Sequence, residues 1–125
     1  MATGLENLKI YQMARDLELK INEITKTFPL DEKYRSVDQL KRSSTAVTNN
    51  IAEAYYKSST KEKIHIFRDI VITEAEETRS NILRCALKGF LSQEMSQDIS
   101  NDYTEFKKAV HGYIRFLKDN PYKFY

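Results

Sequence analysis

The sequence predicts an all-α protein, an antiparallel up-down-up-down four-helix bundle formed by a single domain over residues 1–125. Apolar residues recur at alternating steps of three and four, which is the period of one helix face and not of a strand. Glycine and proline, at three and two residues, are too few to form the many turns of a β-sandwich or barrel. Short polar breaks separate four such segments, so consecutive helices should run antiparallel.

The first helix is expected over residues 5–28, because Pro29 lacks an amide hydrogen and disfavours helical dihedrals at the residue before it. Its apolar stripe comprises Ile10, Ala14, Leu17, Ile21, Ile24 and Phe28. The second helix is expected over residues 31–57, with Asp31 as its N-cap and Glu32 in its first turn. The stripe of this helix comprises Val37, Leu40, Ser44, Val47, Ile51 and Ala54.

The third helix is expected over residues 60–88, and Ser59-Thr60-Lys61-Glu62 has the pattern of a capping box at its start. Its stripe begins with Ile64, Phe67 and Val71 and resumes with Ile82 and Cys85. Glu74 and Thr78 occupy the two stripe positions between these groups. Either the stripe rotates onto Ile70 and Ala75, or this helix carries polar groups inward, and the pattern leaves both interpretations open.

The fourth helix is expected over residues 92–118, with Ser92 as its cap and Gly89 in the left-handed conformation that closes the third helix. Its stripe comprises Met95, Ile99, Tyr103, Phe106, Val110, Tyr113 and Leu117. Asp119-Asn120-Pro121 stops it and opens a tail over residues 119–125. Three aromatic residues within 121–125 are costly to leave in water, so we expect this segment to dock on a bundle face or a neighbouring subunit.

The residue chemistry argues against an enzyme. Three glycines cannot supply a phosphate-binding GxxxxGK loop or a dinucleotide-binding GxGxxG turn. The single cysteine, Cys85, excludes an internal disulfide and a cysteine-built zinc site, and is expected to be a small core residue. The cluster Glu74, Glu76 and Glu77 is expected to be a solvated helix face with one buried, hydrogen-bonded member. We therefore expect no catalytic residue and no cofactor.

A di-iron bundle needs Glu-x-x-His on two helices and a glutamate on each of the other two. Glu62 and His65 match one half of that motif. The other histidine, His111, has Lys108 at the required spacing. We therefore expect no metal site, and His65 is expected to be a surface or rim residue.

The first residues of the chain lack the apolar stretch of a secretory signal. The longest apolar runs are only a few residues, as in Ile70-Val71-Ile72, against the ~20 that a membrane span needs. These observations favour a cytoplasmic protein without a membrane partner.

Short motifs occur in a specific order between residues 11 and 92. The most specific is Asn50-Ile51-Ala52-Glu53 following Gln39-Leu40-Lys41-Arg42. The others are Tyr11-Gln12-Met13-Ala14, Phe28-Pro29 with Tyr34 beyond it, Ser59 with Lys61-Glu62, and Lys88-Gly89-Phe90-Leu91-Ser92. In this arrangement residues 5–118 resemble the bacterial four-helix bundle family encoded within 23S rRNA intervening sequences. Two departures are Ala54, where that family usually has glycine, and Ile72-Thr73, where it tends to have Gly-Ser.

The resemblance implies a four-helix bundle that assembles with itself, as a homopentamer. It also implies a distant likeness to the accessory protein of diversity-generating retroelements, which has the same fold and partners a reverse transcriptase and RNA. The expected partners are therefore other copies of this chain, and RNA or an RNA-processing or reverse-transcriptase-type protein.

A second stripe, small and polar, runs beside the apolar stripe of the second helix, and we call it the polar stripe. It can be a solvated face; it can be structural, with Asn50 and Glu53 satisfying one another; or it can be an interface where small residues allow close helix approach. We favour the structural and interface interpretations together over a ligand site. The polar stripe comprises Gln39, Ser43, Ala46, Asn50 and Glu53, with Arg42 at its edge.

The net charge is only +2, from 20 Lys and Arg against 18 Asp and Glu, with a weak basic bias in the middle of the chain. We expect a non-enzymatic homo-oligomeric bundle that contacts RNA or an RNA-linked protein through this surface. The alternative is a protein–protein scaffold that binds no nucleic acid. A small-molecule-binding bundle has only Glu74 and Thr78 in its support. The candidate phosphate contacts are Arg35, Lys41, Arg42, Lys57 and Lys61.

Overall fold

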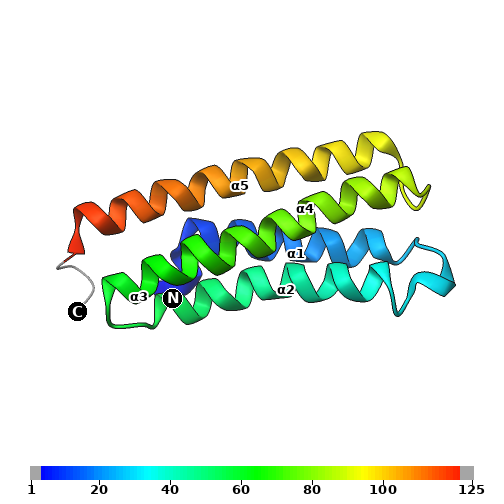
Figure 1. Cartoon of the computed structure of the whole chain (residues 1–125). Coiled ribbons are helices and arrows are strands. Elements are labelled where there is room, and N and C mark those ends of the chain that lie inside the picture. The colour runs from blue at the N-terminus through cyan, green and yellow to red at the C-terminus, as the bar shows by residue number, and fades with distance from the viewer. Residues whose placement is uncertain (1–3, 122–125) are drawn as a thin grey trace.

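The computed structural model describes residues 4–121, and these form helices joined by short turns (Figure 1). The four long helical segments are α1 (Lys9–Thr25), α2 (Ser36–Tyr55), a continuous third segment, and α5 (Gln93–Asp119). The third segment consists of α3 (Thr60–Ile66), the π-helical turn η3 (Phe67–Val71) and α4 (Ile72–Leu87). Two short 3₁₀ turns, η1 (Gly4–Asn7) and η2 (Leu30–Glu32), precede α1 and α2.

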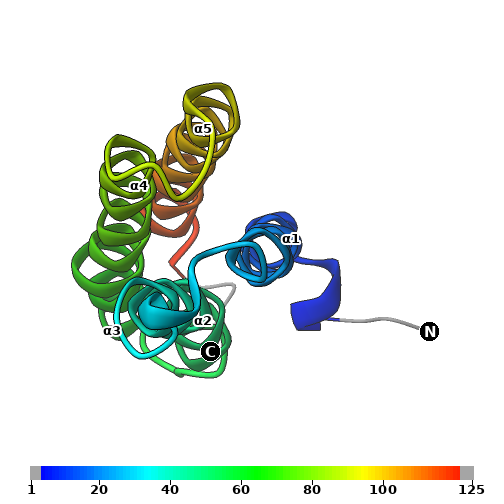
Figure 2. The ribbon, with the colours of Figure 1, turned by 90° about the vertical axis from the view of Figure 1, so that its right-hand side faces the viewer.

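The helices form the predicted up-down-up-down bundle. The colour gradient of Figure 1 shows that each long segment runs opposite to the one before it. Viewed from one end, α1 lies beside α2, α2 faces α4, and α4 lies beside α5 (Figure 2). An ion pair of 2.9 Å between Lys20 and Asp102 joins α1 to α5. The predicted all-α bundle is confirmed.

The predicted apolar stripes form the core. Most members are buried, and Ile21, Leu40, Phe106 and Leu117 are fully enclosed. Ile24, Val37, Ile64 and Tyr113 lie at the core's edge and are half-buried. Met95 was expected in the stripe but is 46% exposed, whereas the next residue, Ser96, is 1% exposed, so the buried face of α5 passes through Ser96 at this turn.

The first two helices begin later than the sequence predicts. Residues 4–7 form a 3₁₀ turn, and the extended backbone of Leu8 separates that turn from α1. Asp31 as the N-cap of the second helix is wrong, because it lies within η2 and α2 begins only at Ser36. Glu32 is buried there, and its carboxylate accepts a hydrogen bond of 2.6 Å from the Ser36 hydroxyl.

The other helix ends follow the prediction closely. Ser59 accepts a hydrogen bond from the Glu62 amide at 3.3 Å, and Ser92 accepts one from the Met95 amide at 3.0 Å. Gly89 has φ +85°, and the amide of Phe90 then returns to the carbonyl of Cys85 at 3.0 Å, which closes the end of α4.

The interrupted stripe of the third helix is explained by η3. A π-helical turn holds one extra residue, which rotates the following helix relative to its neighbours. The buried positions therefore step from Val71 to Ala75 and on to Thr78. Both interpretations of the sequence hold in part, because Ala75 replaces Glu74 in the stripe while Thr78 remains inside the bundle.

Of the predicted tail, residues 119–121 lie within the described part of the chain. The Thr60 hydroxyl donates a hydrogen bond to the carbonyl oxygen of Pro121 at 3.1 Å, which holds the end of α5 against the start of α3. The expectation that the aromatic tail docks falls on residues 122–125, which lie outside the described residues.

Candidate interaction surfaces

The polar stripe lies partly between α2 and α4. Ser43 and Thr78 are buried, and their hydroxyl oxygens are 2.7 Å apart. The Thr78 hydroxyl also lies 2.9 Å from the carbonyl oxygen of Glu74, one turn earlier in α4. Burying a hydroxyl is unfavourable unless it is hydrogen-bonded, so this contact fixes α2 against α4 at one specific register.

An acidic pair on α4, Glu74 and Glu77, lies near Arg42 of α2. The Arg42 guanidinium lies 3.4 Å from the Glu77 carboxylate in a partly exposed ion pair. Glu74 is half-buried, and one of its carboxylate oxygens is enclosed and accepts no hydrogen bond from the described residues 4–121. Burial raises the pKa of Glu74 above its ordinary value, and the neighbouring charge of Glu77 raises it further while Arg42 lowers it.

The remaining members of the polar stripe are more exposed. Asn50 donates a hydrogen bond to the carbonyl of Ala46 at 2.7 Å, and both residues are half-buried. Glu53 instead lies 3.9 Å from Lys57, so the expected pairing of Asn50 with Glu53 does not form. An i,i+4 contact to its own helix backbone is available to Asn50 without help from a second side chain. Gln39 and Glu53 are exposed to solvent.

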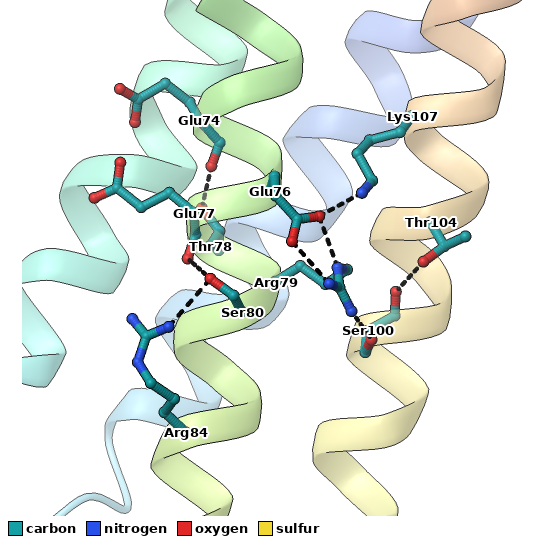
Figure 3. A network of polar contacts seen from close by, with 10 residues as sticks. All are labelled: Glu74, Glu76, Glu77, Thr78, Arg79, Ser80, Arg84, Ser100, Thr104 and Lys107. Atoms are coloured by element: carbon teal, nitrogen blue, oxygen red, sulfur yellow. Dashed lines mark hydrogen bonds and ion pairs between the residues drawn. The ribbon is translucent and has the colours of Figure 1, made fainter.

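A second polar network joins α4 to α5 (Figure 3). Arg79 pairs with Glu76 through two hydrogen bonds of 2.8 and 2.7 Å and also reaches the Ser100 hydroxyl at 3.1 Å. Lys107 of α5 pairs with the same carboxylate. The hydrogen bond from Arg79, together with the contact from Lys107, lowers the pKa of Glu76 to about 2. Glu76 therefore has the most hydrogen bonds of the acidic cluster, and Glu77 accepts a longer one from Arg42. The expectation of a buried, hydrogen-bonded member is wrong for both, because Glu76 is half-buried and Glu77 is exposed.

One buried hydroxyl lacks a partner. Tyr103 of α5 is 1% exposed, and its hydroxyl has no hydrogen-bond partner among residues 4–121. Burial raises the pKa of Tyr103 well above its ordinary value, and the negative charge of Glu18 on α1 adds to this effect. The sequence places Tyr103 in the apolar stripe, and the structure confirms that position.

The five candidate phosphate contacts separate into two groups. Arg35, Lys41 and Arg42 lie toward the start of α2, whereas Lys57 and Lys61 lie beyond its end. Because Arg42 lies 13 residues before the last residue of α2, Tyr55, about 20 Å of helix separates the nearest members of the two groups. Arg42 and Lys57 form ion pairs. Arg35, Lys41 and Lys61 are exposed to solvent and form no ion pair with residues 4–121.

A groove of about 1020 Å³ opens where α2 ends and α3 begins, and we call it the end groove. Its floor is apolar, with Ile64, Ile66 and Ile70, and its rim carries both signs of charge. The sequence identified two of its cations, Lys57 and Lys61, and missed Arg68. Arg68 binds Asp69 at 3.1 Å, and His65 binds the same carboxylate at 2.8 Å. His65 and Arg68 line the groove only because α2 packs against α3. The spacing of residues in the sequence does not reveal this packing.

Lys63 closes the end of α2 beneath this groove. It is 5% exposed, and its ammonium group donates to the carbonyl oxygens of Tyr55 at 2.6 Å and Ala54 at 3.3 Å. A cation at a helix C-terminus satisfies carbonyl groups that have no intrahelical partner. Desolvation by burial lowers the pKa of Lys63. No pattern in the sequence indicates this role.

The opposite end of the bundle exposes apolar side chains. Phe28 and Phe90 are in ring contact at 5.6 Å, which brings the η2 segment beside the turn that follows α4. Leu30, Tyr34 and Leu87 lie at this end and are 94%, 82% and 78% exposed. We call these three residues the apolar tip.

Three further observations concern Cys85, possible metal ligands and membrane-spanning helices. Cys85 is buried, as expected, and burial raises the pKa of its thiol. Within residues 4–121, no three His, Cys, Asp or Glu side chains gather as metal ligands would. None of the described helices is long and apolar enough to cross a membrane.

Comparison with known families decides what the chain is related to. The model of the 23S rRNA-intervening sequence protein family matches residues 6–112. The chain belongs to this family. The resemblance identified from the short motifs is therefore confirmed, and the matched span covers the first three long segments of the bundle and most of α5.

A solved crystal structure supports the fold of this family member. It is a crystal structure of a protein with unknown function from the S23 ribosomal protein family of Bacteroides thetaiotaomicron. It shares 25% sequence identity with our chain at a TM-score of 0.75, and the alignment covers 84% of this chain and 97% of that one. Among curated proteins, no relative matches the sequence.

Proposed function

We propose that this chain is a non-enzymatic assembly protein that forms a homo-oligomer and contacts RNA, or a protein bound to RNA, through cations along α2 and the end groove. The observation that carries the proposal is that Arg35, Lys41 and Lys61 form no ion pair with residues 4–121. A cation already paired with a carboxylate must give up that partner before it binds a phosphate. The three unpaired side chains bear no such cost.

Self-assembly would strengthen a weak electrostatic attraction. A net charge of +2 per chain is too small to attract a polyanion strongly. A homopentamer, as the family resemblance implies, multiplies that charge fivefold and repeats each cation around the assembly. Phosphate binding by such an array depends strongly on salt, because each contact releases condensed counterions.

The positions of the cations constrain how RNA would bind. The nearest members of the two groups lie about 20 Å apart along α2. An RNA that contacts both must run along the helix or bridge neighbouring copies.

The experiment compares matched charge removals in RNA binding measured by fluorescence anisotropy. One variant, Arg35→Gln with Lys41→Gln, removes two unpaired cations. Its control, Lys108→Gln with Lys26→Gln, removes two exposed cations that pair with neighbours on their own helices. The proposal expects the first variant to weaken binding at least tenfold and the control by less than threefold. Equal losses would show a response to net charge alone and would contradict this site.

The apolar tip favours a second candidate function, a protein–protein scaffold that binds no nucleic acid. Leu30, Tyr34 and Leu87 together expose apolar surface of the kind that marks a protein interface. In that case Leu30→Ser with Leu87→Ser would abolish binding of the protein partner, while the Arg35→Gln and Lys41→Gln variant would bind it normally.

A further inference from the structure

The end groove has a shape and a lining suited to apolar side chains. At about 1020 Å³ it is as large as a typical small-molecule pocket or larger, and it can hold several side chains. Ile64 and Ile70 are only half-buried there, so their outer surfaces contact solvent. Glu53 and Glu62 stand on the rim beside Lys57 and Lys61. The apolar floor suits an occupant with apolar groups, and the carboxylates of Glu53 and Glu62 can receive a cation from it.

The described chain ends at the edge of this groove. Asn120 leaves the helical conformation after α5, and its side-chain amide donates to the carbonyl of Phe116 at 3.0 Å. The carbonyl of Pro121 accepts the hydrogen bond from Thr60, and Thr60 itself lines the groove. The next residue of the chain therefore starts at the groove's rim.

The following four residues have the matching composition. They are Tyr122, Lys123, Phe124 and Tyr125, three aromatic residues and one cation. Four extended residues reach about 13 Å. Ile64 lies four residues beyond Thr60, about 6 Å along the helix axis, and Arg68 lies about 12 Å along it. The near part of the floor, at Ile64, is within this reach, and Ile70, about 15 Å along the axis, requires the length of a side chain in addition.

The apolar tip is too distant for this segment. The apolar tip lies at the opposite end of the bundle, past the full length of α5 (Figure 1). The 27 residues of α5 span about 40 Å, three times the reach of four extended residues. Within one chain, residues 122–125 can therefore reach the end groove but not the apolar tip.

We propose that residues 122–125 dock in the end groove of their own chain, with Phe124 against Ile64 and Ile70 and with Lys123 beside Glu53 or Glu62. Burying aromatic rings on an apolar floor is favourable because each ring removes a large apolar area from water. The anchor at Thr60 reduces the entropic cost of docking, since the segment is already tethered at the groove. This docking does not depend on the proposed binding of RNA.

The experiment places a photo-reactive benzophenone side chain at Phe124 in the full-length protein and maps its cross-links by mass spectrometry. Equal amounts of isotope-labelled and unlabelled chains are mixed and co-assembled, so links within a chain and between chains differ in mass. The proposal expects the dominant links to join residue 124 to peptides within residues 53–70 of the same chain. Links mainly between chains, links mainly outside this region, or an absence of links would each overturn it.

A matched pair of variants tests the groove itself. Ile64→Glu introduces a charge into the floor and is expected to reduce the intrachain links at least fivefold. Leu87→Glu makes a comparable change at the opposite end, where the side chain is 78% exposed, and should leave the links unchanged. If Ile64→Glu loses helicity, Ile70→Glu replaces it. Links that persist in a folded floor variant would overturn the proposal. RNA is absent from these measurements, so their outcome is separate from the test of the proposed function.

Discussion

Thr78 of α4 and Ser43 of α2 share a hydrogen bond of 2.7 Å between side chains that are 0% and 1% exposed. The bond joins α2, which carries the candidate cations Lys41 and Arg42, to α4, whose buried positions are shifted by η3. It gives a structural role to Ser43 and Thr78. The sequence pattern left the positions of these two residues in the bundle open, because both are polar.

Thr78→Val is expected to destabilise the protein by about 1–2 kcal/mol, because it leaves the Ser43 hydroxyl buried with a weaker partner. Ser43→Ala added to it should cost less than the sum of the single changes, with a coupling of at least about 0.5 kcal/mol. Urea unfolding of the four proteins measures this cycle. Thr73→Val, at an exposed position of α4, is the control and should change stability by less than about 0.5 kcal/mol. Strict additivity would contradict the contact.

Glu76 is expected to couple stability to acid. Its folded pKa is about 2, below the ordinary 4.5, so the unfolded chain binds a proton more readily. The stabilisation is therefore complete above pH 4.5 and is lost as the pH falls toward 2. Glu76→Gln should melt at a lower temperature than the wild type at pH 7, and the difference should disappear near pH 2. Glu105→Gln, at an exposed carboxylate, should show a much smaller difference.

Glu74 is expected to have the opposite effect. Its pKa is raised in the folded protein, so the folded chain binds the proton more readily, and this group's contribution to stability falls as the pH rises through the raised value. Glu74→Gln should therefore raise the melting temperature at pH 7. The gain should shrink on acidification, as the wild-type carboxylate becomes protonated. A melting temperature that falls at pH 7 would contradict the unfavourable burial of this carboxylate.

Two glycines are expected to respond to alanine with opposite signs. Gly89 has φ +85°, so Gly89→Ala should cost about 1 kcal/mol although no atom lies within 4 Å of the added carbon. Gly112 lies within α5, and the nearest atom to an added carbon is the end of Arg115 at 3.8 Å. Gly112→Ala should therefore stabilise the protein by about 0.5–1 kcal/mol. Thermal unfolding measures both, and a stabilising Gly89→Ala would contradict the assigned turn.

The bundle was predictable because apolar periodicity and capping residues are local signals. The Ser59 and Ser92 caps and the Gly89 turn depend on a few consecutive residues, and all three form as expected. The start of α2 was not predictable in this way. The tertiary burial of Glu32 against Ser36 outweighs the preference of Asp31 for an N-cap.

The candidate surfaces were only partly predictable for the same reason. The sequence identified Lys57 and Lys61 as candidate phosphate contacts, but a groove exists only once α2 and α3 pack together. The extra residue in η3 moves Glu74 out of the stripe and leaves Thr78 inside it. An extra residue of this kind produces no composition signal, so the interrupted stripe was its only trace.

The most direct test of the proposed function is binding of a structured RNA by the wild-type protein at ~50 and ~200 mM salt, with light scattering on the same samples to count subunits. We expect an oligomer that binds RNA saturably at micromolar concentration or below, and its affinity for RNA should fall at least tenfold at the higher salt. An assembled oligomer that fails to bind RNA at ~50 mM salt would contradict it.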